Sequence, residues 1–199
     1  MRTLLAGLAA LLVAAGCASS PAPGAPARIA GPAPELAELF PLAVGNEWTW
    51  DDLSPQLPPG GRRSARTVRV VSRTQDGFFR DSEGTELRVD GECVRDRVRR
   101  LLCRPLAAGG AWKSVVSVSS TERYEIVAVG ERVEVPAGRF DRCVRVRANN
   151  RAGASSEHVL ELTYAPGVGP VRLETWAIVD GVAVPQIRAV LRSFRTGAR

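Results

Sequence analysis

Alternation of apolar and polar residues is the dominant pattern along the chain, and it is clearest between Glu131 and Val146. This segment reads ERVEVPAGRFDRCVRV, in which a Pro-Ala-Gly step interrupts the alternation before it resumes. Period-two alternation is typical of half-buried strands, and Pro136 and Gly138 favour a corner, because proline fixes φ and glycine tolerates positive φ. We therefore predict a strand, a corner and a second strand, with Phe140 as the apolar side chain beneath the corner.

Shorter alternating segments predict further strands before and after this corner. Gln75-Asp76-Gly77 and Asp90-Gly91 are turn sequences at short intervals, which favour antiparallel hairpins because parallel strands need long crossover connections. We expect another hairpin turn at Gly130, and no helix-length period recurs after residue 40. The expected strands begin near Glu47 and otherwise cover residues 67–71, 78–79, 86–103, 113–129, 131–135, 142–148, 158–164, 171–178 and 187–194.

A short helix, a pair of tryptophans and a repeated segment are predicted around the first strand. Residues 34–40, PELAELF, favour a helix of one or two turns, because proline suits the first helical position and acidic side chains suit the positive end of a helix. Trp48 and Trp50 share one strand face, and we interpret them as core anchors, with a platform for a sugar or lipid as the alternative. The segment PLAAGGAW, which ends at Trp112, repeats the earlier PLAVGNEW at five of eight positions and favours one local turn used twice.

The composition is that of one ordinary globular domain. The chain has 199 residues, of which 45% are hydrophobic and 24% are charged, enough for one well-buried core. Its net charge is +6, and among its 27 basic residues only Lys113 is a lysine. A GC-rich genome explains this arginine bias, so we predict no nucleic-acid partner.

The first residues indicate export. Arg2 precedes an apolar run over residues 4–15 that is too short to span the ~30 Å hydrocarbon core of a bilayer, and small residues stand at 14–16, just before Cys17. This pattern resembles the lipobox of bacterial lipoproteins, which implies that Cys17 carries a lipid and anchors the protein to a membrane. No aspartate follows the cysteine, which matches outer-membrane sorting and implies the periplasmic face of the outer membrane.

We predict three parts along the chain. Residues 1–16 are a signal peptide. Residues 17–34 combine the lipidated cysteine with a Pro/Ala/Gly-rich tether, which cannot bury enough apolar surface to offset its ordering entropy. Residues 35–199 form a single β domain.

Three cysteines remain after Cys17, an odd number in an oxidising compartment. One disulfide and one free thiol are the expected outcome. Cys93 and Cys103 are placed to face each other across an arginine-rich hairpin, while a Cys103–Cys143 bridge and the absence of any bridge are the alternatives. Alternation places Cys143 opposite Val144, away from the core, unless a bulge intervenes.

The sequence offers little material for catalysis or metal binding. His158 is the one histidine, there is no C-x-x-C pair, and phosphate-loop and dinucleotide fingerprints are absent, so we predict no metal and no cofactor. Two kinds of nucleophile and base pair can be considered: Ser155 or Ser156 with His158, and Cys143 with His158. Neither has a nucleophile elbow, an oxyanion signature or a designated carboxylate. We therefore expect a protein that is not an enzyme.

Three blocks resemble a known group. FPLAVGNEWTW, VEVPAGRFDRCVRVR and TYAPGVGPVRLE occur in the order of the FPLxxGNxW, VPAGxF and YAPGVG blocks of bacterial lipoproteins of unknown function. The resemblance implies an architecture similar to the lipoprotein-carrier and receptor folds. The implied fold class is mainly β, a curved antiparallel sheet forming a half-barrel or incomplete barrel with one short N-terminal helix. It assigns no functional residue.

The function we predict is binding in the cell envelope. The lipid-anchored domain receives an apolar ligand, or a lipidated or protein partner, in the concave face of the curved sheet. The alternative is a structural or assembly lipoprotein that docks an envelope protein complex and has no ligand cavity. A filled core favours the alternative, and a continuous apolar cleft of several hundred Å³ favours binding.

Overall fold

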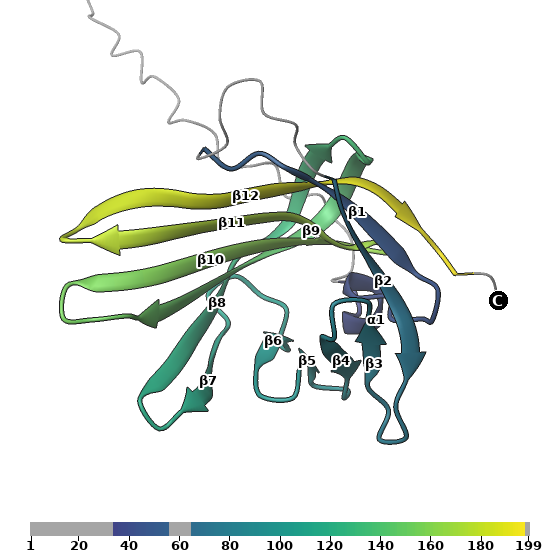
Figure 1. Ribbon diagram of the computed structural model, residues 1–199, viewed down its shortest axis with the longest axis horizontal. Helices are drawn as coiled ribbons and strands as arrows, with labels where there is room; N and C mark the ends of the chain where they lie inside the picture. The colour runs from purple at the N-terminus through teal and green to yellow at the C-terminus, as the bar shows by residue number, and fades with distance from the viewer. Residues whose placement is uncertain (1–33, 56–64, 198–199) are drawn as a thin grey trace, which may run out of the picture.

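The computed structural model describes residues 34–55 and 65–197 (Figure 1). The predicted signal peptide, Cys17 and all of the tether except Pro34 lie outside the described residues. One short helix, α1 (Leu36–Leu39), confirms the helix predicted in residues 34–40. The strands are β1 (Glu47–Asp52), β2 (Arg66–Arg73), β3 (Phe79–Asp81), β4 (Glu86–Val89), β5 (Cys93–Arg95), β6 (Arg100–Cys103), β7 (Ala111–Ser117), β8 (Ser120–Val135), β9 (Gly138–Arg151), β10 (Ser156–Ala165), β11 (Gly169–Val179) and β12 (Val182–Arg195).

All described strands belong to one antiparallel sheet that curls into a nearly closed barrel. The spatial order is β6-β5-β4-β3-β2-β1-β12-β11-β10-β9-β8-β7. Each strand pairs with its sequence neighbours except at β6 and β7, which are the two ends of the sheet. The β1–β12 pair joins two six-stranded meanders. Figure 1 shows the long strands β9 to β12 on one side and the short strands β3 to β6 on the other. The predicted mainly β, curved antiparallel architecture is confirmed.

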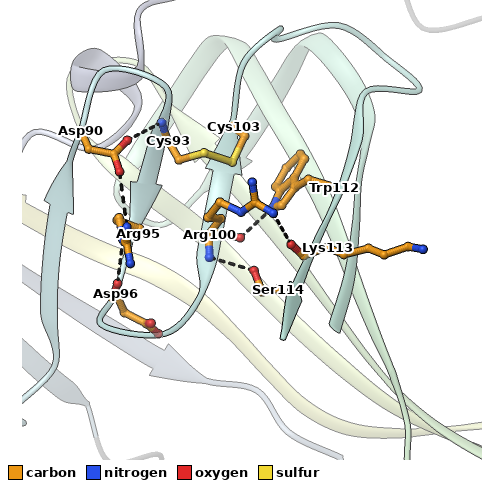
Figure 2. The surroundings of a disulfide bond; sticks show 9 residues. All are labelled: Asp90, Cys93, Arg95, Asp96, Arg100, Cys103, Trp112, Lys113 and Ser114. Atoms are coloured by element: carbon orange, nitrogen blue, oxygen red, sulfur yellow. Dashed lines mark hydrogen bonds and ion pairs between the residues drawn. A yellow bond between two sulfur atoms is a disulfide. The ribbon is translucent and has the colours of Figure 1, made fainter. Parts of the chain in front are cut away.

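Side chains bridge the remaining gap between the terminal strands β6 and β7 (Figure 2). The Trp112 Nε1–H donates to the Arg100 carbonyl at 2.7 Å, and the Arg100 N–H donates to Ser114 Oγ at 2.9 Å. The Arg100 guanidinium also donates to the Lys113 carbonyl at 2.5 Å. These contacts stand where a backbone ladder would close a complete barrel.

The interior contains two apolar clusters. The first receives α1 and Phe40, whose side chains pack against residues of β5, β6 and the β8–β10 region. Its buried members are Leu36, Leu39, Phe40, Val94, Leu102, Tyr124, Ile126, Val144, Val146, Ala148 and Tyr164. The second cluster comprises Trp48, Val70, Val133, Val135, Cys143, Ala165, Val171, Val190 and Leu191. In the part of the chain that the structure describes, no helix is both long and apolar enough to cross a bilayer.

The Pro-Ala-Gly corner is a tight hairpin between β8 and β9. Val135 pairs with Gly138, whose φ of 138° suits glycine, and the Ala137 N–H donates to the Leu191 carbonyl of β12 at 3.0 Å. Phe140 packs at the edge of the second cluster and is only partly buried. Phe140 is therefore less enclosed than we predicted for the side chain beneath the corner.

Cys143 is buried, which corrects the facing that strict alternation predicts. Arg142 has a φ of 57°, and the β8–β9 register shifts several times along the ladder, including between Glu131 and Val133. A residue in the left-handed region rotates the next side chain and is typical of a bulge. As a result Cys143 and Val144 are both fully buried, each in a different apolar cluster.

One predicted turn lies elsewhere. Gly130 has a φ of 83° but lies inside β8 at a register shift, so the prediction of a hairpin there is wrong. The chain instead reverses between Ser117 and Ser120, where β7 meets β8. The last hairpin turns at Asp180-Gly181, both with positive φ, and β12 begins five residues earlier than the predicted strand, at Val182. Positive φ alone does not separate a turn from a bulge.

Candidate ligand-binding cavity

One apolar cavity of about 460 Å³ opens inside the curved sheet. Strands from both meanders build its wall: β1 to β4 on one side and β10 to β12 on the other. Its lining residues are Phe40, Leu42, Trp48, Trp50, Asp52, Arg66, Val68, Val70, Phe79, Asp81, Leu87, Leu162, Pro170, Leu173, Ile187 and Ala189. Thirteen of these sixteen side chains are apolar, so the wall suits an apolar ligand.

Trp48 and Trp50 enter the cavity because alternate residues of β1 point to the same face. Trp48 is buried, its Nε1–H donates to the Val168 carbonyl at 2.7 Å, and its ring lies 5.2 Å from that of Phe194. Trp50 is only partly buried. Trp48 is thus an anchored core residue as well as part of the wall, while Trp50 presents a more accessible ring.

The three charged side chains of the wall are engaged by neighbouring protein groups. Asp52 Oδ1 accepts from the Ser54 N–H at 2.8 Å, and Asp81 Oδ1 accepts from the Thr85 N–H at 2.8 Å. Arg66 forms a two-pronged ion pair with Glu83, and this hydrogen bonding lowers the pKa of the Glu83 carboxyl. The apolar surface is therefore the part of the wall that a ligand would cover.

Cys93 and Cys103 form a disulfide outside the cavity (Figure 2). They are directly paired across β5 and β6, and the Cys93 N–H donates to Asp90 Oδ1 at 2.9 Å at the hairpin turn. Trp112 is also remote from the cavity wall: its ring stacks on Tyr124 with centroids 5.4 Å apart. These residues stabilise the β5–β8 side of the barrel.

Cys143 carries the free thiol among the described cysteines. Its Sγ donates weakly to the Phe140 carbonyl at 3.6 Å. Burial raises the pKa of the Cys143 thiol to about 12, with smaller contributions from Glu131 and Asp141. A thiol in this state is a packing group and a poor nucleophile at neutral pH.

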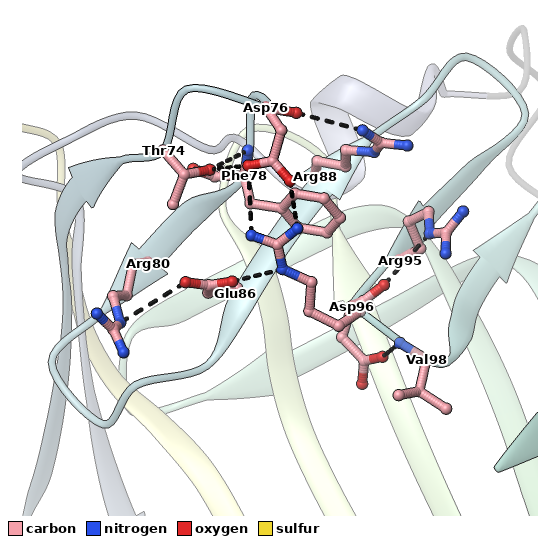
Figure 3. A network of polar contacts seen from close by, with 10 residues as sticks. Thr74, Asp76, Phe78, Arg80, Glu86, Arg88, Arg95, Asp96 and Val98 are labelled. Atoms are coloured by element: carbon pink, nitrogen blue, oxygen red, sulfur yellow. Dashed lines mark hydrogen bonds and ion pairs between the residues drawn. The ribbon is translucent and has the colours of Figure 1, made fainter. Parts of the chain in front are cut away.

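A polar network closes the outer side of the β3–β6 region (Figure 3). The Phe78 ring is buried. The guanidinium carbons of Arg97 and Arg88 lie 3.9 and 4.6 Å from the centroid of this ring. Arg97 pairs with Asp76 and Glu86, and its hydrogen bond lowers the pKa of Asp76 to about 2. Sequence alternation gave no signal for this cluster, because its members come from the β2–β3 turn, strand β4 and the β5–β6 turn.

The cysteine and the histidine considered for catalysis lie far apart. Cys143 and Asn150 lie seven positions apart on β9, and Asn150 pairs with His158 of β10, so the thiol and the imidazole are separated by about 23 Å of strand. Ser155, Ser156 and His158 do not line the cavity. Among the described residues there is no cluster of three or more His, Cys, Asp or Glu side chains arranged for a metal ion.

A nearly closed antiparallel barrel with an internal apolar cavity is thus the structural class. No family model matches the chain, and no curated protein matches it. Two solved structures resemble it. One is described as a "putative exported protein with YmcC-like fold" from Bacteroides fragilis, with a TM-score of 0.46 and 16% identity, covering 77% of this chain and 97% of that one. The other is a "putative lipoprotein" from Parabacteroides distasonis, with a TM-score of 0.41 and 15% identity, covering 83% and 100%. At this level of likeness neither structure defines a function for this chain.

Proposed function

We propose that the protein binds an apolar ligand, a lipid acyl chain, in the cavity between β1–β4 and β10–β12. The observation that carries this proposal is the 460 Å³ volume bounded by thirteen apolar side chains. Small-molecule sites of about 300–1,000 Å³ with a mostly apolar wall and a few polar groups are the usual form of a ligand pocket. The partly buried Trp50 ring offers a contact surface at the accessible part of the wall.

The cavity favours binding over the rival function of a purely structural envelope lipoprotein. Protein interiors are packed to near crystal density, so an apolar space of this size costs stability unless something fills it. A structural protein gains nothing from that cost. A binding protein regains it when the ligand enters.

The proposal also includes the cellular location predicted from the N-terminal sequence. A lipid on Cys17 would hold the domain at the periplasmic face of the outer membrane, and the tether would let it stand off the bilayer. The role proposed there is binding and not catalysis. The cavity wall contains no serine, cysteine or histidine, and its one arginine is paired with Glu83.

Quenching of tryptophan fluorescence by bromodecanoate tests the proposal. Bromine quenches an indole only at close range, so a fatty acid that enters the cavity should quench Trp50 in a saturable way. Trp50→Phe should reduce the saturable quenching, and the part that remains should come from Trp48, which also lines the wall. Linear, unsaturable quenching that is unaffected by Trp50→Phe would overturn the proposal.

A matched pair of substitutions locates the site. Ala189→Phe fills the cavity from β12 and should abolish saturable quenching. Ala183→Phe introduces the same side chain on the same strand at an exposed position outside the cavity wall, and it should bind like the original protein. Thermal melts of both variants establish that each remains folded. Equal binding by the two variants would place the ligand elsewhere.

A further inference from the structure

The β11–β12 hairpin exposes apolar side chains that the cavity alone does not explain. Val179, Val182, Val184 and Ile187 are 46%, 63%, 43% and 49% exposed. From Thr175 to Ile187 the sequence contains a single charged residue, Asp180 at the turn, although 24% of the whole chain is charged. Contiguous exposed apolar surface of this kind marks an interaction site.

The strand register places these side chains on the face that lines the cavity. Directly paired residues of an antiparallel ladder point the same way, and so do alternate residues of one strand. Leu173 pairs with Ala189, and both line the cavity. Further along the same ladder Ala177 pairs with Val184, and Val179 pairs with Val182. The exposed valines therefore continue the cavity wall toward the hairpin tip.

A bulge in β12 brings Ile187 onto this same face. Thr175 pairs with Ile187 but Trp176 pairs with Pro185, so Gln186 is an extra residue on β12. In a regular strand without that bulge, Ile187 and Val184 would point to opposite sides, because they are three positions apart. With it, Val179, Val182, Val184 and Ile187 form one apolar strip, called here the hairpin strip. Ile187 belongs both to the strip and to the cavity wall.

We propose that the hairpin strip is the outer half of the ligand site and holds the part of a long acyl chain that extends beyond the cavity. This inference rests on the proposed function and adds the ligand class: a lipid with a long chain. From Leu173 to Val179 the strip and the wall together extend over about 20 Å of strand. In Figure 1 the hairpin formed by β11 and β12 reaches the end of the molecule opposite the C-terminus.

The edge of the hairpin favours an acyl chain over a peptide strand. The register of β1 with β12 ends at Ala189, so Val182 to Ile187 extend beyond the strand that pairs with β12. A peptide that added to this edge would use backbone donors, and Pro185 has no N–H to offer. The side chains of the strip supply apolar surface without such a ladder, which suits a hydrocarbon chain.

Chain-length dependence tests the inference. Dibromostearate and bromodecanoate are titrated into the protein and into the double variant Val182→Ser/Val184→Ser, with tryptophan quenching as the readout. Because the two valines would contact only the carbons that lie outside the cavity, the variant should bind dibromostearate roughly tenfold more weakly and bromodecanoate with unchanged affinity. Val115→Ser/Val118→Ser, which removes two exposed valines near the β7–β8 turn, is the matched control and should change neither affinity.

The outcomes separate this inference from the proposed function. If bromodecanoate binds and the hairpin variant retains full affinity for dibromostearate, the strip has no part in binding and the inference alone fails. If the hairpin variant weakens both acids equally, the selectivity for long chains is wrong. If neither acid shows saturable quenching in the original protein, the proposed function and this inference fall together.

Discussion

At the scale of single residues, Cys143 shows how one backbone angle decides the environment of a side chain. The positive φ of Arg142 turns Cys143 into the second apolar cluster, against the facing that alternation alone predicts. The consequence is chemical as well as geometric. A buried thiol loses the solvation that would stabilise its thiolate, and its pKa rises to about 12.

We expect Cys143 to resist alkylation in the native state. In a Cys17→Ser background, iodoacetamide at pH 8 should leave the thiol unmodified for as long as the protein stays folded, and it should react at once in urea. Mass spectrometry counts the added groups. Fast native modification would show that Cys143 is accessible and that the bulge at Arg142 is misassigned.

The same thiol predicts a pH dependence of stability. The folded pKa is raised from a reference of 9.0 to about 12, so burial of the neutral thiol contributes stability below pH 9, and that contribution is lost as the pH rises toward 12. The free energy of unfolding should therefore fall more steeply above pH 9 in the original protein than in Cys143→Ala. Burial also raises the pKa of Tyr124 and Tyr164, but these tyrosines are present in both proteins, so the difference isolates the cysteine. Parallel curves would contradict the prediction.

Phe140 and Arg139 are neighbours on β9 whose replacement by alanine should cost different amounts of stability. Phe140 is partly buried against the second cluster, so Phe140→Ala should cost about 2 kcal/mol, less than the ~3–5 kcal/mol of a fully buried phenylalanine. The Arg139 side chain is 65% exposed and pairs with exposed Glu134, so Arg139→Ala should cost no more than about 0.5 kcal/mol. Urea melts measure both. A larger loss from Arg139→Ala would contradict the observed facing of β9.

At the scale of elements, the repeated PLAxG segments make the same turn twice. The Gly45 N–H donates to Val70 at 2.8 Å, and the Gly109 N–H donates to Ile126 at 2.8 Å. Asn46 and Gly110, one residue later, donate back to Ala43 and Ala107 and accept from the same Val70 and Ile126. The turn residues are related by an offset of 64 residues, whereas their partners Val70 and Ile126 are 56 residues apart. Each turn opens the first strand of one six-stranded meander.

Local sequence patterns predicted some of these elements and not others. Local signals sufficed where turn residues and alternation agreed, as at Asp90-Gly91 and the Pro-Ala-Gly corner. They failed at Gly130, because a bulge and a turn both use a glycine at positive φ. For the cavity, the sequence predicted only the concave face of a curved sheet. Its wall joins β1–β4 with β10–β12, and no local pattern records which distant strands become neighbours.

The β5–β6 hairpin should depend on its disulfide. These are strands of three and four residues, and Cys93–Cys103 closes a short loop, for which chain entropy gives about 3 kcal/mol. The variant Cys93→Ser/Cys103→Ser should lose about that much stability in urea melts. Binding in the cavity should be retained, because neither cysteine lines it. A loss of ligand affinity with little loss of stability would show that the hairpin belongs to the site.

At the scale of the whole molecule, we propose a lipid-anchored envelope protein whose barrel contains a binding cavity. Cys17 lies outside the described residues, and its lipidation remains a prediction. Replacing Cys17 with serine should move the protein from the membrane fraction to the soluble fraction, because the acyl chains supply the anchor. An unchanged membrane fraction would exclude Cys17 as the anchor, without bearing on the cavity.

The barrel as a whole brings two meanders together around one apolar space, and the central claim is that a lipid fills that space. The most direct measurement is mass spectrometry of lipids extracted from the protein purified from its native membrane, compared with Ala189→Phe prepared in the same way. We predict about one equivalent of a long-chain lipid with the original protein and a strong reduction with the variant. Equal lipid content in the two proteins, or none in either, would contradict it.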